Sequence, residues 1–183
     1  MSYFATPANF YFPWYVRLLF WLQRRHYGHE LEPARLWGRT PRVFLSMAAM
    51  YGALNRKASP LAPALRTLIL VRVSQINWCA FCIDINSATG IKHGVSEEKL
   101  AALPQFTESD LFDEGEKAAL AYAEEMTYSD RRSDPALIAT LQRYFSNDAI
   151  IELTALIAYQ NLSSKFNAAL GVPAQGFCDA ARI

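Results

Sequence analysis

The sequence predicts an all-α fold, and three observations support this prediction. Apolar residues recur at helical spacing through most of the chain. Small polar residues and proline stand where these segments begin, and glycine or proline often follows where they end. Almost no segment alternates apolar and polar residues as a strand does; the valine-rich stretch 67–76 is the only rival candidate.

The composition narrows the class of protein. With 183 residues the chain fits one domain that buries its own core without disulfide bonds. Its 18 basic and 17 acidic residues nearly cancel, so no basic face indicates nucleic acid. The densest apolar run, residues 10–22, contains Pro13 and Arg17 and is too short to span a bilayer. No signal peptide is evident, and three cysteines suggest a reducing compartment. We therefore expect a cytoplasmic protein that binds neither nucleic acid nor membrane.

The first helix is expected at residues 14–27, inside an aromatic-rich segment. It is apolar over nearly its whole circumference, and such helices are usually buried on more than one side. Burial at a subunit interface and burial within its own domain explain this equally well. A break at residues 28–33 follows, and one short helical turn is expected at residues 33–38.

The remaining helices follow from local start and stop signals. Thr40 and Pro41 are a suitable N-cap and first position for a helix to about Asn55. Asn147 is expected to cap the final helix. The other helices are expected at about residues 63–76, 77–93, 96–103, 114–127, 134–144 and 148–170.

Two of the three cysteines, Cys79 and Cys82, form a C-x-x-C pair. If Asn77 caps the helix that follows, both cysteines lie in its first turn, where unpaired N–H groups and the helix dipole favour a thiolate. A thiolate is the nucleophilic form of cysteine. On the same helix face, Asn86 lies one turn below Cys82. This layout indicates a dithiol/disulfide site.

Two other interpretations of the pair compete with redox chemistry. A zinc site needs four ligands, but the chain has no second C-x-x-C and only three histidines. One of these, His93, would lie about 16 Å along the helix from Cys82, so we expect no metal and no other cofactor. Burial among Trp78 and Phe81 would raise the pKa of both thiols and leave them inert. The third cysteine, Cys178, follows the last helix and is expected to be a free thiol.

A resemblance to a known family rests on three runs of residues. These are RVSQINWCAFCIDIN at 72–86, GVSEEKL at 94–100 and NLSSKFNAALG at 161–171. Together they resemble the carboxymuconolactone decarboxylase/alkylhydroperoxidase D-like family over roughly residues 30 to 173. The resemblance implies an alkylhydroperoxidase D-like helical bundle that forms a homo-oligomer (dimer, trimer or hexamer). The expected organisation is an N-terminal extension (1–30), this helical domain (31–173) and a C-terminal tail (174–183).

The resemblance also implies an activity. In the well-studied branch of the family, the second cysteine attacks a peroxide and becomes a sulfenic acid, which the first cysteine resolves to a disulfide. By this resemblance Cys82 is peroxidatic and Cys79 is resolving. The implied substrate is a small hydroperoxide or a partner disulfide, and the implied reductant is a dithiol protein or a small thiol.

The chain departs from that branch at the proton relay. The branch usually places a glutamate twelve residues before the first cysteine and a histidine four after the second; here these positions hold Thr67 and Asn86. Neither side chain titrates near neutral pH, so neither can act as a general base. Both remain candidates for lining the site, as do Ser74 and Gln75, whose simpler explanation is hydrogen bonding at a helix end.

The sequence is compatible with three functions. The leading one is a thiol-dependent oxidoreductase with peroxiredoxin-type alkylhydroperoxidase activity, acting through Cys79 and Cys82. The second is a lactone decarboxylase, against which the C-x-x-C pair argues because such members generally lack it. The third is a non-catalytic helical oligomer with a lapsed redox site, which the missing relay favours.

Overall fold

The computed structural model describes residues 2–7 and 9–178, and these residues form helices and no strand. The all-α prediction is confirmed, and the valine-rich stretch 67–76 is helical. The elements are α1 (Trp14–Tyr27), α2 (Glu32–Trp37), α3 (Pro41–Leu54), α4 (Pro63–Ile76), α5 (Ala80–Lys92), α6 (Glu97–Ala101), the short 3₁₀ helix η1 (Leu103–Gln105), α7 (Glu114–Thr127), α8 (Pro135–Leu141) and α9 (Asn147–Ala169).

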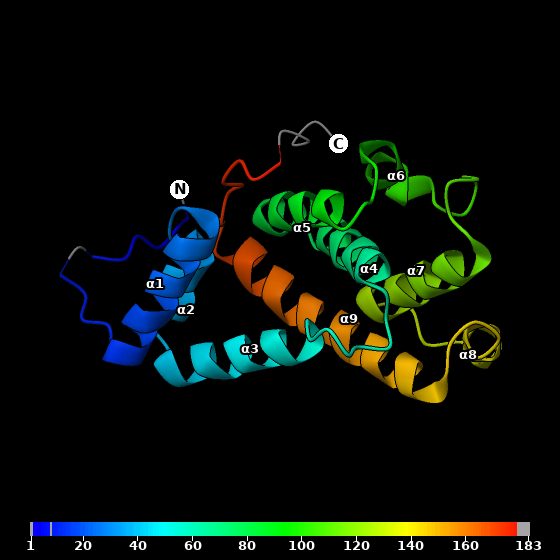
Figure 1. Ribbon diagram of the computed structural model, residues 1–183, viewed down its shortest axis with the longest axis horizontal. Coiled ribbons are helices and arrows are strands. Elements are labelled where there is room, and N and C mark those ends of the chain that lie inside the picture. The colour runs from blue at the N-terminus through cyan, green and yellow to red at the C-terminus, as the bar shows by residue number, and fades with distance from the viewer. Residues whose placement is uncertain (1, 8, 179–183) are drawn as a thin grey trace.

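Helix α4 is the centre of the larger hydrophobic core. Its neighbours α5, α7 and α9 pack around it, and Figure 1 shows α9 crossing the middle of the molecule beside them. Because α4 has neighbours on several sides, it is apolar nearly all round instead of on one stripe. Leu68, Ile69 and Val73 are fully buried in this core.

A smaller core joins α1, α2 and α3. Val16 and Phe20 of α1 are buried in it, while Trp14, Leu18 and Trp21 on the same helix are exposed. Within one chain α1 therefore buries one face and presents a second apolar face to the surroundings. No helix in the described part of the chain, α1 included, has both the length and the apolar character needed to cross a bilayer.

An aromatic stack connects the small core to α9. The ring of Trp37, at the end of α2, lies 3.6 Å from the ring of Phe166 between centroids, and the two planes are 18° apart. This contact fixes the N-terminal helices against the C-terminal half of α9. A cavity lies between these parts, and it holds the candidate site.

Several predicted helix ends are wrong by a few residues. The final helix is capped by Ser146, whose hydroxyl accepts the Ala149 N–H, and not by Asn147. Helix α8 ends at Leu141 instead of residue 144. Leu141 is fully buried in the larger core, and the chain turns after it. The helix expected at residues 96–103 ends at Ala101, and η1 follows it at Leu103–Gln105. Local signals identify these helices well, and tertiary packing decides the last turn.

Candidate active site

Cys79 and Cys82 are joined by a disulfide at the N-terminus of α5, with Cα atoms 5.2 Å apart. Cys79 is the N-cap of this helix, and its Sγ accepts the Cys82 backbone N–H over 3.2 Å. Cys82 is the third helical residue, within the turn where the helix dipole stabilises negative charge. The placement of both cysteines inside the first turn is therefore wrong for Cys79.

The turn before α5 explains this difference. Asn77, expected to cap the cysteine helix, instead ends α4. The next residue, Trp78, has φ of +56° and redirects the chain between the two helices. The Trp78 side chain is 87% exposed, so of the two aromatic residues in the alternative interpretation only Phe81 helps to bury the cysteines.

Buried apolar side chains surround the disulfide. Both cysteines are buried in a cluster with Leu36, Phe81 and Val172. These neighbours come from α2, from α5 itself and from the segment after α9. A reagent in water meets little of either sulfur, so substrates must reach the disulfide through a cavity or after a local opening.

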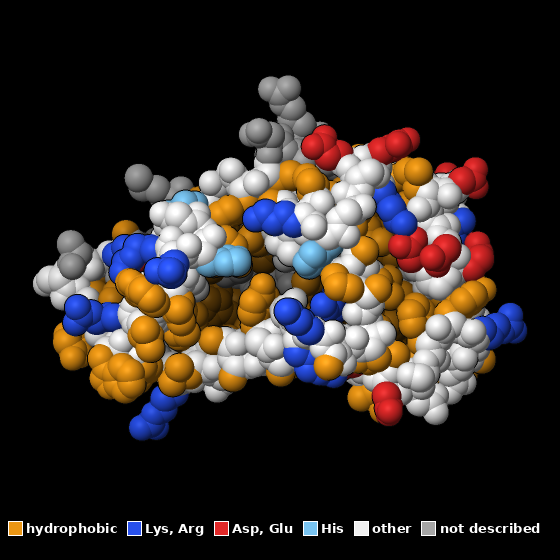
Figure 2. Space-filling view, in the orientation of Figure 1, with side chains coloured by type: hydrophobic (Ala, Val, Ile, Leu, Met, Phe, Trp, Pro, Cys, Tyr) orange, Lys and Arg blue, Asp and Glu red, His pale blue; other side chains and the backbone are white. Residues whose placement is uncertain are grey.

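A cavity of about 500 Å³ lies beside Cys82, and Cys82 forms part of its wall. Helices α1, α2, α3, α5 and α9 all contribute to its lining. Figure 2 shows a hollow with hydrophobic side chains in the region bordered by α1 and α3. Among the described residues, no Asp, Glu, Lys or Arg side chain lines the cavity. The site is thus suited to an uncharged molecule.

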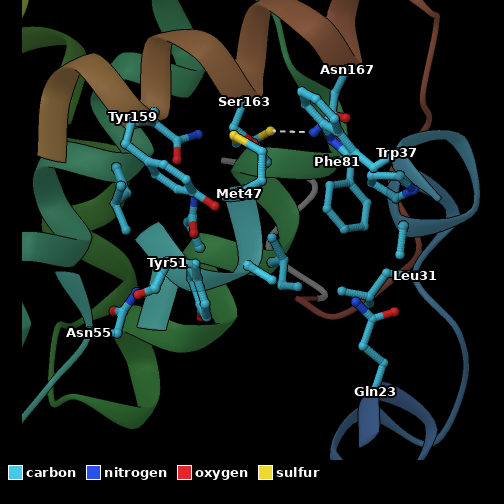
Figure 3. A pocket seen from close by; sticks show the side chains of 18 of the residues that line it. Gln23, Leu31, Trp37, Met47, Tyr51, Asn55, Phe81, Tyr159, Ser163 and Asn167 are labelled. Atoms are coloured by element: carbon cyan, nitrogen blue, oxygen red, sulfur yellow. Dashed lines mark hydrogen bonds between the residues drawn. The ribbon is translucent and has the colours of Figure 1, made fainter. Parts of the chain in front are cut away.

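Asn167 of α9 contacts the disulfide from the cavity side (Figure 3). Its Nδ2 donates a hydrogen bond to Cys82 Sγ over 3.3 Å. The side chain is 2% exposed, and its Oδ1 has no hydrogen-bond partner within the described chain. Sequence reasoning did not single out Asn167. The available signal was the spacing of Gln160, Ser164 and Asn167, which places three polar groups on one face of α9.

The two relay positions lie in different surroundings. Asn86 lines the cavity together with Cys82, whereas Thr67 is not among the residues that line it. The Thr67 hydroxyl donates to the Pro63 carbonyl over 3.0 Å and lies 3.1 Å from His93 Nδ1. The structure therefore brings Asn86 to the cysteine and leaves Thr67 buried near the far end of α5.

Ser74 and Gln75 make hydrogen bonds within and between helices. The Ser74 hydroxyl donates to the Leu70 carbonyl over 2.6 Å and accepts from Gln160 Nε2 over 2.8 Å. Gln75 Oε1 accepts from Arg72 Nη1 over 3.2 Å. Gln160 lines the cavity, but Ser74 and Gln75 do not. Ser74 contacts the site in two ways: its hydroxyl holds Gln160, and its backbone carbonyl accepts the Cys79 N–H over 3.0 Å.

Three phenols line the cavity. They are Tyr27 from α1, Tyr51 from α3 and Tyr159 from α9, and Figure 3 shows Tyr51 and Tyr159 on the same side. Burial, followed by the neighbouring Tyr51 phenol, raises the pKa of both Tyr27 and Tyr159 above the ordinary value for tyrosine. These groups are therefore uncharged hydrogen-bonding groups at neutral pH, which preserves the neutral character of the cavity.

Asp84 anchors the segment that follows α9. This buried side chain accepts the backbone N–H groups of Gln175 and Gly176 over 2.8 Å each and of Cys178 over 2.7 Å. Cys178 is buried and unpaired with either other cysteine. Phe177 lies against the aromatic ring of Phe81, next to the disulfide. Residues 175–178, which Asp84 holds in place, therefore pack over the side of the disulfide formed by Phe81.

The histidines and other metal-binding residue types are dispersed. Within residues 2–7 and 9–178, no group of three His, Cys, Asp or Glu side chains could hold a metal ion. His26 and His29 are exposed, although His26 also borders the cavity. His93 caps the C-terminus of α5.

Comparisons with known proteins connect this arrangement to a family. A model of the carboxymuconolactone decarboxylase family matches residues 41–125. The uncharacterized protein YnjA of Escherichia coli strain K12 is 43% identical over 166 residues, which are 91% of each chain. The identity to YnjA extends well beyond the span of the family model, over nearly the whole chain.

Two solved structures share the fold. A peroxidase-related protein from Ralstonia eutropha JMP134 with an alkylhydroperoxidase AhpD core superposes with a TM-score of 0.86 at 19% identity, covering 100% of this chain and 97% of its own. The debrominase Bmp8 superposes with a TM-score of 0.79 at 23% identity, covering 91% of this chain and 89% of its own. At these identities the likeness shows the fold alone.

Proposed function

This chain belongs to the carboxymuconolactone decarboxylase family, and from that premise we propose that it is a thiol-dependent oxidoreductase that reduces organic hydroperoxides through Cys82 and Cys79. One observation carries the proposal. Cys82, disulfide-bonded to Cys79, lines an apolar cavity and accepts a hydrogen bond from Asn167. The sulfur of Cys82 therefore lies in the wall of a cavity large enough for a small organic substrate.

The proposed reaction has three steps. The Cys82 thiolate attacks the distal oxygen of the hydroperoxide, the O–O bond breaks, and the alkoxide takes a proton to leave as an alcohol. Cys82 is then a sulfenic acid, and the Cys79 thiolate attacks its sulfur, forming the disulfide as the hydroxyl takes a proton and leaves as water. A dithiol protein or small thiol of the cytoplasm reduces the disulfide by exchange and is itself oxidised.

Two structural features support Cys82 as the attacking residue. It occupies the first turn of α5, where the helix dipole favours the thiolate. It also accepts the Asn167 hydrogen bond, and such a bond is stronger to a charged acceptor than to a neutral one. In the proposed mechanism these two features stabilise the thiolate in place of the Glu/His relay that the chain lacks.

The lyase alternative receives less support from the cavity. A carboxymuconolactone is a carboxylic acid and ionised at neutral pH, so a site for it would be expected to offer a cation. The cavity lining contains neither Lys nor Arg among the described residues. Burial of an unpaired carboxylate in such surroundings is costly. A cavity whose lining offers His26 as its one possible cation, among the described residues, is better matched to a neutral hydroperoxide.

Peroxide consumption by cysteine variants tests the proposal. With cumene hydroperoxide and a dithiol reductant, the wild-type protein should turn over and Cys82→Ser should not. Cys79→Ser, first reduced and then freed of dithiol, should react once with the peroxide and stop, leaving a sulfenic acid on Cys82 that dimedone traps and mass spectrometry locates. Turnover by Cys82→Ser at the wild-type rate would overturn the assignment. An inactive wild-type protein with a stable disulfide would instead favour a lapsed redox site.

A further inference from the structure

A second cavity borders the N-terminal helices. Its walls come from the segment before α1, from α1 itself and from the residues around the start of α2, and they enclose about 390 Å³. The lining of this second cavity consists of Arg17, Arg24, Glu30, Arg35 and the aromatic residues 10–12 and 20. None of these residues lines the cavity beside Cys82. The second cavity is therefore a separate site that the proposed peroxide chemistry does not use.

Positive charge dominates the lining of the second cavity. Three arginines face one glutamate, which gives the lining a net charge of +2. The carboxylate of Glu30 holds two of the arginines: its Oε2 accepts from Arg35 Nη1 over 3.0 Å, and its Oε1 accepts from Arg24 Nη1. Within the described part of the chain, Arg17 forms no ion pair. Glu30 thus orders two guanidinium groups before a ligand arrives, and the charge of Arg17 is left to the ligand.

The surface around the second cavity carries the same sign of charge. Residues 1–56 contain seven arginines, no lysine and two acidic residues, which gives them a net charge of +5, while the whole chain carries +1. The near balance of charge in the sequence therefore conceals a separation of charge in the fold. Figure 2 shows Arg and Lys side chains over α1 and α2, and Asp and Glu side chains gathered at the opposite end over α6 and α7. An anion that approaches α1 is attracted by this field as well as by the lining.

Aromatic rings form the rest of the wall. The ring centroids of Phe10 and Phe12 lie 4.8 Å apart, and those of Phe12 and Phe20 lie 5.0 Å apart in an edge-to-face arrangement. Phe20 is buried in the small core, so this group of rings is attached to the packed interior. The guanidinium carbon of Arg39 lies 5.6 Å from the ring centroid of Phe10. A ligand that combines a charged group with an apolar body can therefore contact both kinds of wall.

We propose that the second cavity binds a small phosphate monoester with an aromatic or other apolar body. Its volume of about 390 Å³ falls in the range of sites for small organic ligands. A phosphate monoester carries a charge of about −1.5 to −2 at pH 7, which matches the net charge of the lining, whereas a monocarboxylate supplies one negative charge. The phosphate oxygens accept from the guanidinium groups of Arg17, Arg24 and Arg35, whose planar shape suits phosphate. The organic body packs against Phe10 and Phe12.

Titration calorimetry of the full chain with phenyl phosphate tests this inference at neutral pH and low ionic strength. Phenyl phosphate should bind about 10-fold more tightly than inorganic phosphate, which lacks the ring, and than benzoate, which carries a single charge. Arg17→Gln and Arg35→Gln should each weaken the binding of phenyl phosphate about 10-fold, the scale of one hydrogen bond between charged groups. The matched control is Arg25→Gln, because Arg25 is exposed on α1 but does not line the second cavity; this variant should keep the wild-type affinity.

Equal affinities for phenyl phosphate and inorganic phosphate, or no measurable binding of phenyl phosphate, would overturn the inference. An equal loss of affinity in Arg17→Gln and Arg25→Gln would also overturn it, because the field around α1 would then explain the binding without the cavity. Arg17 is exposed and forms no ion pair with any described residue, so its variant decides the question even if Arg35→Gln fails to fold. The outcome is independent of the peroxidase test: Cys79→Ser/Cys82→Ser should bind phenyl phosphate as the wild type does, and loss of binding there would contradict a separate site.

Discussion

Asn167 Nδ2 donates a hydrogen bond to Cys82 Sγ over 3.3 Å, and 85 residues separate the two along the chain. The contact joins the last helix to the N-terminus of α5, so it depends on the packing of the whole domain. It also gives the sulfur a hydrogen-bond donor in a place where solvent does not reach it.

Removing the Asn167 donor should make the reduced Cys82 a weaker nucleophile at neutral pH. A hydrogen bond to a charged group contributes about 1.5–3 kcal/mol, so Asn167→Leu should slow alkylation of Cys82 by iodoacetamide at pH 7 about 10-fold. The rate should recover at high pH, where the thiolate forms without help. Quenched alkylation read by mass spectrometry, in a Cys178→Ser background, measures this. An unchanged pH profile would show that Asn167 does not stabilise the thiolate.

Introducing a general base at position 86 should raise peroxide turnover. Asn86 lines the cavity with Cys82, so an imidazole there can take the thiol proton, and such catalysis typically contributes about 100-fold or more. Asn86→His is therefore expected to increase kcat/KM for cumene hydroperoxide at least about 10-fold. No gain would mean that proton removal does not limit the reaction.

Thr67 is a harder position at which to restore the relay. It is buried, and a Cβ added at Gly90 would lie 2.7 Å from its Cγ2, so the surroundings leave little room there. Thr67→Glu alone should lower the melting temperature, because it adds volume and a carboxylate at a buried position. Combined with Asn86→His it should recover part of that loss if the two groups pair. Thermal unfolding of the single and double variants checks this, and identical melting temperatures for both would rule out pairing.

Asp84 should control access to the site through the tail. Its carboxylate accepts three backbone N–H groups from residues 175–178, and Asp84→Asn leaves an amide that cannot accept all three as well. We expect faster alkylation of Cys178 and faster reduction of the disulfide by dithiothreitol, each about 10-fold or more, because local opening becomes easier. Asp130→Asn, at an exposed position, is the control. Equal rates in Asp84→Asn and wild type would show that the tail does not limit access.

Local signals predicted the helices better than they predicted the site. Residues 14–27 and 114–127 were expected as helices and match α1 and α7 at both ends. Pro13 and Gly28 flank the first of these helices, and Asp113 caps the second. The start of α5 was misplaced because the turn at Trp78 depends on an uncommon backbone conformation. The contacts of Asn167 and Asp84 span 85 to 94 residues, and one sequence without its fold does not reveal such pairs.

The exposed apolar face of α1 leads to a prediction about assembly. Trp14, Leu18 and Trp21 follow helical spacing and stay exposed in the single chain. We propose that a second copy of the chain covers them, as expected for a homo-oligomer. Light scattering after size exclusion should show an oligomer for the wild-type protein and a shift toward monomer for Leu18→Glu/Trp21→Glu. A monomeric wild-type protein at micromolar concentration would contradict this.

Counting thiols in a single turnover tests the central claim most directly. The reduced protein carries three cysteine thiols, and one equivalent of cumene hydroperoxide should remove two of them, leaving a disulfide between Cys79 and Cys82 and one equivalent of cumyl alcohol. Dithiothreitol should then restore all three thiols. If three thiols remain after peroxide addition and no alcohol forms, Cys79 and Cys82 are not a peroxide-reducing pair, and the proposed function is wrong.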